Sequence, residues 1–233
     1  MARRNGETVQ DRIVALIHDR QLQPGAPMPT EPQLMDLLGA SRNSVREAVR
    51  ALQALGIVEI RHGFGTFVGR ASLDVLGPSL EFRIRSGPHG VRALHDLVEV
   101  REMLETALVA RVAGSTSPSR LAALDALVTA MQTDLEADRA FHALLYESCG
   151  NELVLQLIDL FWQVYHQVEP LLGAPDERMD VTVGNHRRIV DALRAGDASA
   201  AQEAMQRHFR DVKERIARAE AAQAAKPLDG EAA

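Results

Sequence analysis

Apolar residues recur at the spacing of an α-helix along most of this chain, a pattern that predicts a mainly α fold. The first apolar stripe lies within residues 9–17 and the second within residues 34–38. Thr30 and Gln33 form a capping box before the second stripe, where Pro32 suits the first helical turn. We therefore expect two short amphipathic helices near the N-terminus, with inner faces formed by Val9, Ile13, Leu16, Ile17, Leu34, Leu37 and Leu38.

A third helix and a β-hairpin are predicted next. Ser41 can cap a helix that begins at Arg42, and Gly56 suits the left-handed residue that ends such a helix. Short apolar stretches at 57–60 and 66–68 flank the loop RHGFG, whose glycines allow the positive φ of a tight hairpin. The order of three helices and a small hairpin wing predicts a winged helix-turn-helix domain at residues 6–69.

From residue 91 onward the pattern is helical and shows no convincing strand. Two Gly-Pro turns predict a linker at 70–90, with one short helix from Leu73 as an open alternative within it. The helical pattern predicts an antiparallel all-α bundle at 91–222. A further break near Leu135 stays open as an alternative. The remaining expectations are helices at 91–114, 118–150, 152–172, 179–195 and 198–222, and a disordered tail at 223–233.

Length and composition agree with two domains. The 233 residues, 46% apolar and 25% charged, suffice for two separate cores. No apolar run approaches the ~20 residues of a membrane span, and the N-terminus lacks the apolar core of a signal peptide. The single cysteine, Cys149, excludes an internal disulfide and fits a reducing compartment. We therefore expect a cytoplasmic protein without membrane contact.

The net charge of −6 is unevenly distributed. Residues 1–70 carry nine arginines and seven acidic residues, a net +2, whereas residues 71–233 carry 17 basic and 25 acidic residues, a net −8. Only the first part suits a nucleic-acid partner, because the acidic part repels phosphate. Since even the first part is only mildly basic, we expect binding to double-stranded DNA to require a homodimer.

Three arginines mark a candidate DNA-binding face. Arg42, Arg46 and Arg50 recur every fourth residue and therefore share one side of the third helix, opposite its apolar side. A charged stripe by itself is more often only a solvated face. Its position on the last helix of a winged helix-turn-helix, the element that enters the major groove, favours DNA binding.

The segments LQPGAPMPTEPQLMDLLGASRNSVREAVRALQALGIVEI and HGFGTFV resemble the N-terminal domain of GntR-family transcription regulators over residues 10–68. Many such regulators have a DNA-contacting arginine where this chain has Pro32, which implies one missing contact. The resemblance implies that the third helix contacts phosphates and base edges and that the hairpin tip forms the wing at the DNA. The matching residues are Ser41, Arg42, Ser44, Arg46, His62 and Gly63.

A second constellation lies in the predicted bundle. Asp138 and His142 are four residues apart and share a helix face. If the helices on either side of Ala195 form a hairpin, His186 and His208 lie within roughly 3–6 Å of the same level along it. One carboxylate and three imidazoles suit zinc, nickel or manganese. Alternatively, each histidine is an ordinary hydrogen-bonded or surface residue.

The patterns D-x-x-F-H, NHRRIVDALRAGD and AMQRHF resemble the FCD effector-binding domain of the FadR subfamily of GntR regulators, over residues 91–220. This resemblance implies that Asp138, His142, His186 and His208 hold a divalent metal beside an effector cavity. Zinc is the favoured metal, with nickel and manganese as alternatives. Because acyl-CoA-binding members lack these four residues, the resemblance argues against a fatty-acid sensor.

Arg101 suggests the chemistry of the effector. It lies within an apolar helix face, and a buried arginine requires an anion. Glu105, one turn later, is one candidate partner. The FCD resemblance instead places Arg101 in the cavity, where it grips an effector carboxylate, with Asn185 as a further effector contact. Trp162 and Tyr165 are either cavity residues or plain core.

These features together predict a metabolite-responsive transcription regulator and not an enzyme. We expect a homodimeric repressor of a catabolic operon that leaves a palindromic operator when a sugar acid or hydroxy acid binds beside the metal. The sequence leaves activation open as the alternative to repression. A metal sensor and a metal-dependent hydrolase are the competing hypotheses, although no general base is evident near the four ligand candidates.

Overall fold

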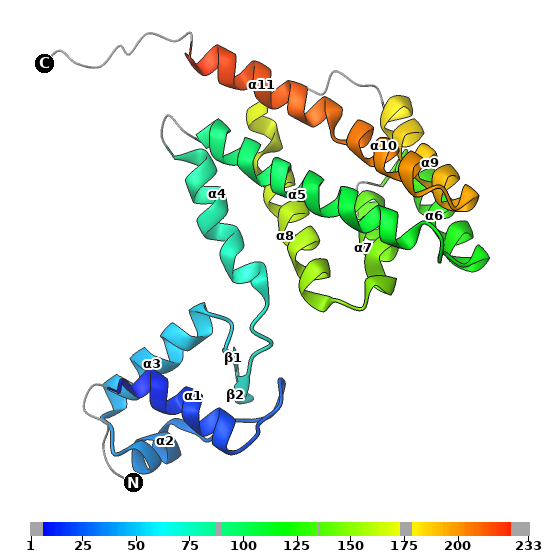
Figure 1. The fold of residues 1–233 in the computed structure, drawn as a ribbon. Helices are drawn as coiled ribbons and strands as arrows, with labels where there is room; N and C mark the ends of the chain where they lie inside the picture. The colour runs from blue at the N-terminus through cyan, green and yellow to red at the C-terminus, as the bar shows by residue number, and fades with distance from the viewer. Residues whose placement is uncertain (1–6, 87–89, 135, 173–178, 225–233) are drawn as a thin grey trace, which may run out of the picture. The chain divides into compact units, whose positions relative to one another are not determined.

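The computed structural model describes residues 7–86, 90–134, 136–172 and 179–224. The chain divides into two compact units, Met1–Val75 and Leu76–Ala233 (Figure 1). The first unit, here called the head, contains three helices and a two-stranded sheet. Its elements are α1 (Val9–Asp19), α2 (Glu31–Leu38), α3 (Arg42–Ala54), β1 (Val58–Arg61) and β2 (Gly65–Val68).

Helices α2 and α3 begin at the predicted caps, whereas the cap of α1 was not predicted. Thr8 forms a capping box with Asp11 before α1, and Thr30 forms one with Gln33 before α2. Gly39 ends α2 in the left-handed conformation, with φ of 55°. The apolar faces then meet in one core, to which all three helices and both strands contribute. Its members include Ile13, Ile17, Leu34, Leu38, Val45, Val49, Leu52, Val58 and Val68.

The strands form an antiparallel hairpin whose register pairs Val58 with Val68 and Arg61 with Gly65. The other edge of β2 is also bonded. The amide of Met28 donates to the carbonyl of Thr66 (2.8 Å), and the amide of Val68 donates to the carbonyl of Ala26 (2.9 Å). The segment between α1 and α2 therefore covers the edge of the wing.

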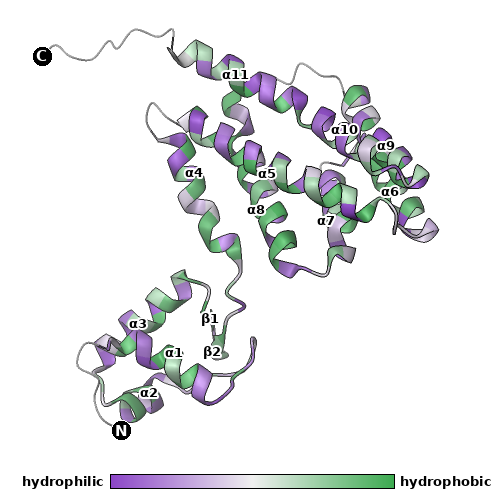
Figure 2. Cartoon of the chain, in the orientation of Figure 1, coloured by the Kyte–Doolittle hydropathy of each residue, from purple (hydrophilic) through white to green (hydrophobic). Residues whose placement is uncertain are grey.

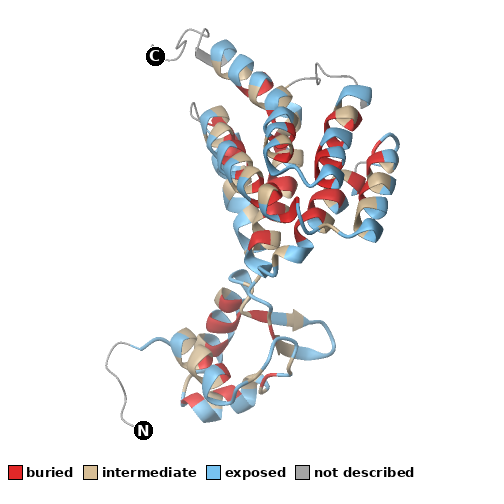
Figure 3. Cartoon of the chain, turned by 45° about the vertical axis from the view of Figure 1, so that its right-hand side comes forward, coloured by how far each residue is buried: buried red, intermediate tan, exposed pale blue. Residues whose placement is uncertain are grey.

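The second unit is an all-α bundle, and α5 is its central helix, packed on α4, α7, α8, α10 and α11. Apolar and polar stretches alternate along its helices (Figure 2), and the buried residues line their inward faces (Figure 3). No described helix is both long enough and apolar enough to cross a membrane. The short helix η1 (Leu73–Leu76) crosses the boundary between the two units. The elements of the bundle are α4 (Gly77–Arg85), α5 (Gly90–Val112), α6 (Pro118–Ala130), α7 (Glu136–Tyr146), η2 (Glu147–Cys149), α8 (Glu152–Val168), η3 (Glu169–Leu172), α9 (Met179–Ala195), α10 (Ala198–His208) and α11 (Arg210–Ala224).

The boundaries differ from the sequence-based ones between residues 70 and 90, the expected linker. Helix α4 occupies much of this range and packs on α5 and α8. Its Ile84 is buried, and Arg85 donates a hydrogen bond to the carbonyl of Gln167. The Gly77-Pro78 pair, interpreted as a turn, instead lies in the first turn of this helix. The backbone N–H that proline lacks would have no partner within the helix there.

Two long predicted helices are interrupted. The open alternative near residue 135 is the observed one, because α6 ends at Ala130 and α7 begins at Glu136, whose amide donates to Asp134 (2.9 Å). Leu135 itself lies outside the described residues. The helix expected at 198–222 is divided at Phe209, and α11 extends to Ala224. The rest of the expected tail, 225–233, lies outside the described residues.

Candidate functional site

The candidate DNA-contacting residues lie on α3 and the wing. Helix α3 begins at Arg42 because Oγ of Ser41 accepts a hydrogen bond from the amide of Ser44 (3.2 Å). One side of α3 is buried in the core of the head, and the arginine stripe lies on the exposed side. The exposed candidates are Ser41, Arg42, Arg46, Arg50, His62 and Gly63, whereas Ser44 is partly buried.

Arg46 is oriented by a residue that the sequence analysis did not single out. Its Nε lies 2.9 Å and 3.1 Å from the two carboxylate oxygens of Glu31, at the start of α2. The two side chains are 55% and 38% exposed, so the pair contributes little to stability. Glu31 binds the Nε atom of the guanidinium and leaves the edge that carries the two Nη groups for other contacts. Arginine uses this edge in bidentate contacts with guanine.

The wing tip carries a further exposed group. Phe64 is 84% exposed between Gly63 and Gly65, both of which have positive φ. Behind the tip, Arg61 pairs with Glu59 (2.9 Å) and lies over the ring of Phe67, 4.3 Å from its centroid. These contacts brace the hairpin that presents His62 and Phe64.

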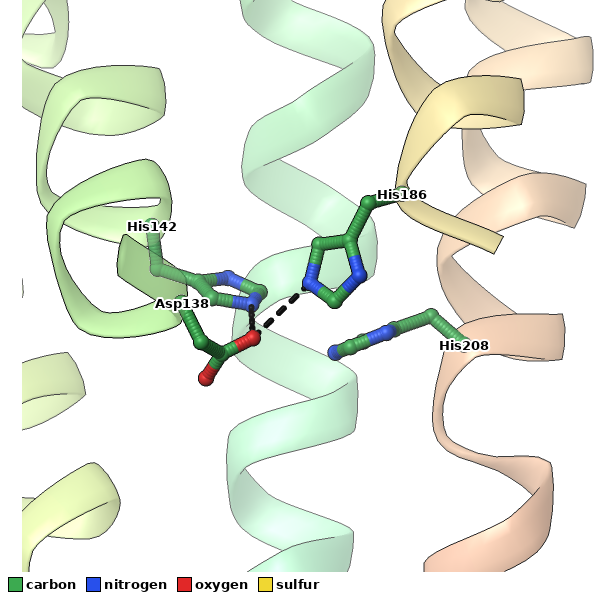
Figure 4. A group of neighbouring side chains, drawn as sticks. All are labelled: Asp138, His142, His186 and His208. Atoms are coloured by element: carbon green, nitrogen blue, oxygen red, sulfur yellow. Dashed lines mark ion pairs between the residues drawn. The ribbon is translucent and has the colours of Figure 1, made fainter. Parts of the chain in front are cut away.

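Four side chains converge in the bundle (Figure 4). Asp138 and His142 project from α7, His186 from α9 and His208 from the end of α10, and one ligand atom of each lies within 4.8 Å of the others. Oδ1 of Asp138 is 2.9 Å from Nε2 of His186 and 3.8 Å from Nε2 of His142. His142 and His186 are buried, and the other two are partly buried. The spacing argument about Ala195 thus anticipated the approach of His186 to His208.

Hydrogen bonds behind the cluster orient two imidazoles. Nδ1–H of His186 donates to the carbonyl of Thr182 (2.9 Å), and Nδ1–H of His142 donates to Oε2 of Glu105 (2.5 Å). Each bond selects the tautomer whose Nε2 has its lone pair free. Both Nε2 atoms are buried and have no hydrogen-bond partner among the described residues. Because Nε2 of His186 is only 2.9 Å from Oδ1 of Asp138, either a proton or a metal ion must lie between them. One carboxylate and three imidazoles with their nitrogens turned inward are a donor set that fits a divalent metal.

The expected protonation states also match a ligand set. Burial raises the pKa of Asp138, but His186, His142 and His208 outweigh burial and hold that pKa well below its usual value. Burial lowers the pKa of His208 well below its usual value, and the nearby His186 and His142 lower it further. Near neutral pH, Asp138 is therefore a carboxylate and His208 a neutral imidazole, the forms that bind metal.

Glu105 links the cluster to Arg101. Its Oε1 accepts a hydrogen bond from Nε of Arg101 (2.6 Å), while Oε2 accepts the bond from His142. Burial raises the pKa of Glu105, but His142 and Arg101 outweigh it and lower the pKa to about 2. Glu105 is therefore the internal partner anticipated for Arg101, and its contact with His142 was not anticipated.

A cavity of about 420 Å³ adjoins the cluster, and its lining includes Asp138, His208, Arg101 and Asn185. Nη2 of Arg101 is buried and has no hydrogen-bond partner in the described part of the chain. The guanidinium therefore has both an internal carboxylate and an unsatisfied donor. Oδ1 of Asn185 accepts a hydrogen bond from Arg188 (2.8 Å).

The two aromatic candidates lie in different surroundings. Tyr165 lines the cavity, whereas Trp162 is buried and its Nε1 donates to Oδ2 of Asp138 (2.7 Å). The sequence analysis also missed Glu169 and Arg215, which line the cavity from η3 and α11. Only the packing of helices distant in sequence brings these side chains together.

Comparisons with known proteins agree with this architecture. The family model for bacterial regulatory proteins of the gntR family matches residues 5–68, and the FCD domain model matches residues 96–211. The chain is 30% identical over 214 residues to the uncharacterized HTH-type transcriptional regulator YcbG of Bacillus subtilis, covering 89% of this chain and 88% of that protein. It is 27% identical over 208 residues to the galactonate operon transcriptional repressor of Escherichia coli, covering 83% and 90%.

A solved structure agrees as well. The Streptococcus agalactiae GntR protein matches with a TM-score of 0.62 at 29% identity, covering 88% of this chain and 97% of that one. The predicted fold class, a winged helix-turn-helix followed by an all-α bundle, is confirmed, and the relatives are regulators and not enzymes. The chain therefore belongs to the GntR family of bacterial transcription regulators, with an FCD domain after its winged helix-turn-helix head.

Proposed function

We propose that this protein is a homodimeric repressor of a catabolic operon, released from a palindromic operator when a sugar acid or hydroxy acid binds beside a divalent metal. The observation that carries the proposal is the cavity, whose lining includes two metal-ligand candidates and Arg101. A regulator that acts on a chromosomal operator works in the bacterial cytoplasm.

The head binds the operator DNA. Arg42, Arg46 and Arg50 enter the major groove on α3, while Ser41 and Ser44 contact phosphate and the wing tip at His62 and Gly63 contacts the neighbouring backbone or groove. Residues 1–70 carry a net charge of only +2, and Pro32 stands where many relatives have an arginine. Two heads on one palindrome compensate for this weakness, which supports a dimer.

The bundle binds the metal and the effector. Asp138, His142, His186 and His208 hold the metal, with zinc favoured and nickel or manganese as alternatives. When bound, the metal supplies positive charge and open coordination positions to an anionic ligand. Arg101 directs its unsatisfied Nη2 at the ligand carboxylate, and Asn185 adds a polar contact. The galactonate operon repressor of E. coli, whose name gives a sugar acid and repression, supports this ligand class.

Release of DNA tests the proposal. The probe is a fluorescent duplex that the wild-type protein selects from a random-sequence library. Protein stripped with a chelator is titrated with zinc alone, with galactonate, gluconate or lactate alone, and with each pair. We expect DNA release only when metal and acid are both present, because each contributes to one site.

Other outcomes would overturn the proposal in distinct ways. Release by zinc alone would show a metal sensor, and turnover of an acid, followed by NMR, would show an enzyme. His186→Ala should lose metal by elemental analysis, whereas His18→Ala, which removes an exposed histidine of α1, should retain it. Equal metal content in both variants would remove the metal site from the proposal.

A further inference from the structure

The most exposed large apolar side chain among the described residues is Phe64, at the tip of the wing, which is 84% exposed. We infer that Phe64 inserts into the minor groove of the operator, partly unstacks one base step there and so selects a flexible pyrimidine–purine step. The inference rests on the proposed function, since it presumes that α3 lies in the major groove and that the wing lies at the neighbouring minor groove.

The position of Phe64 is informative, whereas its exposure alone is not. Single exposed apolar residues are common on protein surfaces and by themselves indicate nothing. Phe64, however, follows His62 and Gly63, the two residues proposed to lie at the DNA, and it has no part in the core of the head. Its ring therefore gains the free energy of burial only when another molecule covers it, and the molecule proposed to lie at the wing is DNA.

The backbone of the tip is a short, well-defined turn. Arg61 and Gly65 form the last pair of the hairpin, so the loop consists of residues 62–64. The amide of Phe64 donates a hydrogen bond to the carbonyl of Arg61 (2.9 Å), and Gly63 and Gly65 have φ of 79° and 109°. Such positive values favour glycine and are typical of tight hairpin turns. A tip that is already ordered loses little conformational freedom on binding, which favours insertion of the ring that it carries.

The side chains of the tip offer little charge for contacts with phosphate. Nε and Nη2 of Arg61 donate to the carboxylate of Glu59 over 2.9 Å and 3.0 Å, and the guanidinium lies over the ring of Phe67. The loop itself consists of a histidine, a glycine and a phenylalanine, none of which carries a permanent charge. Apolar contact with deoxyriboses and bases is therefore the main contribution that these side chains can make to affinity.

Insertion of a phenyl ring gives sequence preference without a hydrogen bond to a base. Apolar side chains such as phenylalanine partly unstack a base step when they enter the minor groove. This deformation costs least at TA and CA/TG steps, which are flexible. Each half-site should therefore contain such a step where the wing lies, besides the guanine contacted by Arg46. The contact adds affinity that does not depend on charge, in a head where residues 1–70 carry a net charge of only +2.

Library selection and affinity measurements on the full chain test the inference. Phe64→Ala should lose the preference for a TA or CA/TG step and should bind the duplex selected by the wild type at least about fivefold more weakly. The salt dependence of its binding should equal that of the wild type, because the substitution removes no contact between a positive charge and phosphate. Phe64→Leu keeps an apolar side chain that can insert, so its affinity should stay within about twofold of the wild type. Leu153→Ala, which removes an exposed apolar side chain of α8, should retain both affinity and consensus sequence.

The adenine analogue 2-aminopurine reports the insertion directly. It fluoresces more strongly when it is unstacked, and it is placed in the duplex at the preferred step. Its fluorescence should rise at least about twofold when the wild type or Phe64→Leu binds, because the ring separates the stacked bases. Phe64→Ala at a saturating concentration should produce no such rise.

Three results would each overturn the inference. They are a wild-type consensus without a TA or CA/TG step, wild-type affinity in Phe64→Ala, and binding of the wild type without a rise in 2-aminopurine fluorescence. Each leaves DNA binding by α3 in place if Arg46→Ala still weakens binding. If the wild-type protein selects no duplex from the library, the proposed function fails along with the inference.

Discussion

Nδ1 of His142 donates a hydrogen bond to Oε2 of Glu105 over 2.5 Å, and both side chains are buried. The contact joins α7 to α5 across 37 residues of sequence. It orients the imidazole so that its Nε2 faces Asp138, and it places Arg101 on the other oxygen of the same carboxylate. Glu105 therefore determines the geometry of both the metal-ligand candidates and the candidate effector contact.

Replacing Glu105 by glutamine should weaken metal binding by about 10- to 100-fold, the usual cost of losing a partner behind a metal-bound histidine. The amide removes the negative charge that holds Nδ1–H of His142. Zinc affinity measured by competition with a chromogenic chelator checks this expectation. The control is Glu203→Gln, an exposed carboxylate of α10, and equal zinc affinity in both variants would contradict the role of Glu105.

Arg101→Ala should abolish the response to the acid while DNA binding stays within twofold of wild type. The arginine lies in the bundle, and Glu105 keeps its bond to His142 when Arg101 is removed. Anisotropy of the selected duplex during titration with the acid measures the response. Arg111→Ala, an exposed arginine of the same helix, should respond normally. A normal response from Arg101→Ala would leave this residue as a structural partner of Glu105 only.

Arg46→Ala should weaken DNA binding by about 1–3 kcal/mol, roughly 5- to 150-fold, and relax the preference for guanine at one position of each half-site. Arg20→Ala removes the same charge from the C-terminal end of α1, where it makes no groove contact in the proposal. The thermal melting of the bundle should not change in either variant. Equal losses of affinity would show that Arg46 contributes only charge.

Glu31→Gln tests the orientation of Arg46 while Arg46 keeps its own charge. The substitution weakens the hold on Nε of Arg46 but also removes a negative charge near the DNA. We expect a reduced preference for guanine without a large loss of overall affinity. Repeating the library selection with this variant gives the measurement, and an unchanged consensus sequence would contradict the orienting role.

The metal-free protein should lose stability as the pH falls from 7.5 to 5.5. Burial and neighbouring imidazoles lower the pKa of His208 in the folded chain, so the unfolded chain binds a proton that the folded chain does not. That contribution is present above the unfolded histidine pKa of about 6.5 and is lost below it, by about 1 kcal/mol at pH 5.5. Calorimetric melting in the presence of chelator measures it. His208→Gln should flatten the pH dependence, whereas an unchanged slope would exclude His208 as its source.

Local signals predicted the head well. Caps at Thr30 and Ser41 and glycines at 39, 56 and 63 act within a few residues of the elements that they define, so the sequence shows them directly. Asp138 and His142 were predictable as a pair for the same reason. The approach of His186 to His208 followed from helix geometry once a hairpin was assumed.

Contacts set by packing were not predictable. Glu105 reaches His142, and Glu31 reaches Arg46, only because two helices pack at a certain depth and rotation, and periodicity gives neither. A short helix from Leu73 was only an alternative within the expected linker, because Gly77-Pro78 is compatible with both a turn and a helix start, and the burial of Ile84 distinguishes them. The contacts of Arg215 with Tyr165 and Glu169 join α11 to α8 and η3, and α11 begins at a break at Phe209 that the apolar pattern does not mark.

Phe209 separates His208, the last residue of α10, from the first residue of α11, and its ring lies 5.4 Å from the guanidinium carbon of Arg101. One residue therefore lies beside a metal-ligand candidate, a candidate effector contact and the start of a 15-residue helix. A helix of that length is ~22 Å long. A rotation of a few degrees at Phe209 is small at the cavity, but it grows along α11 and becomes largest at the far end of the helix.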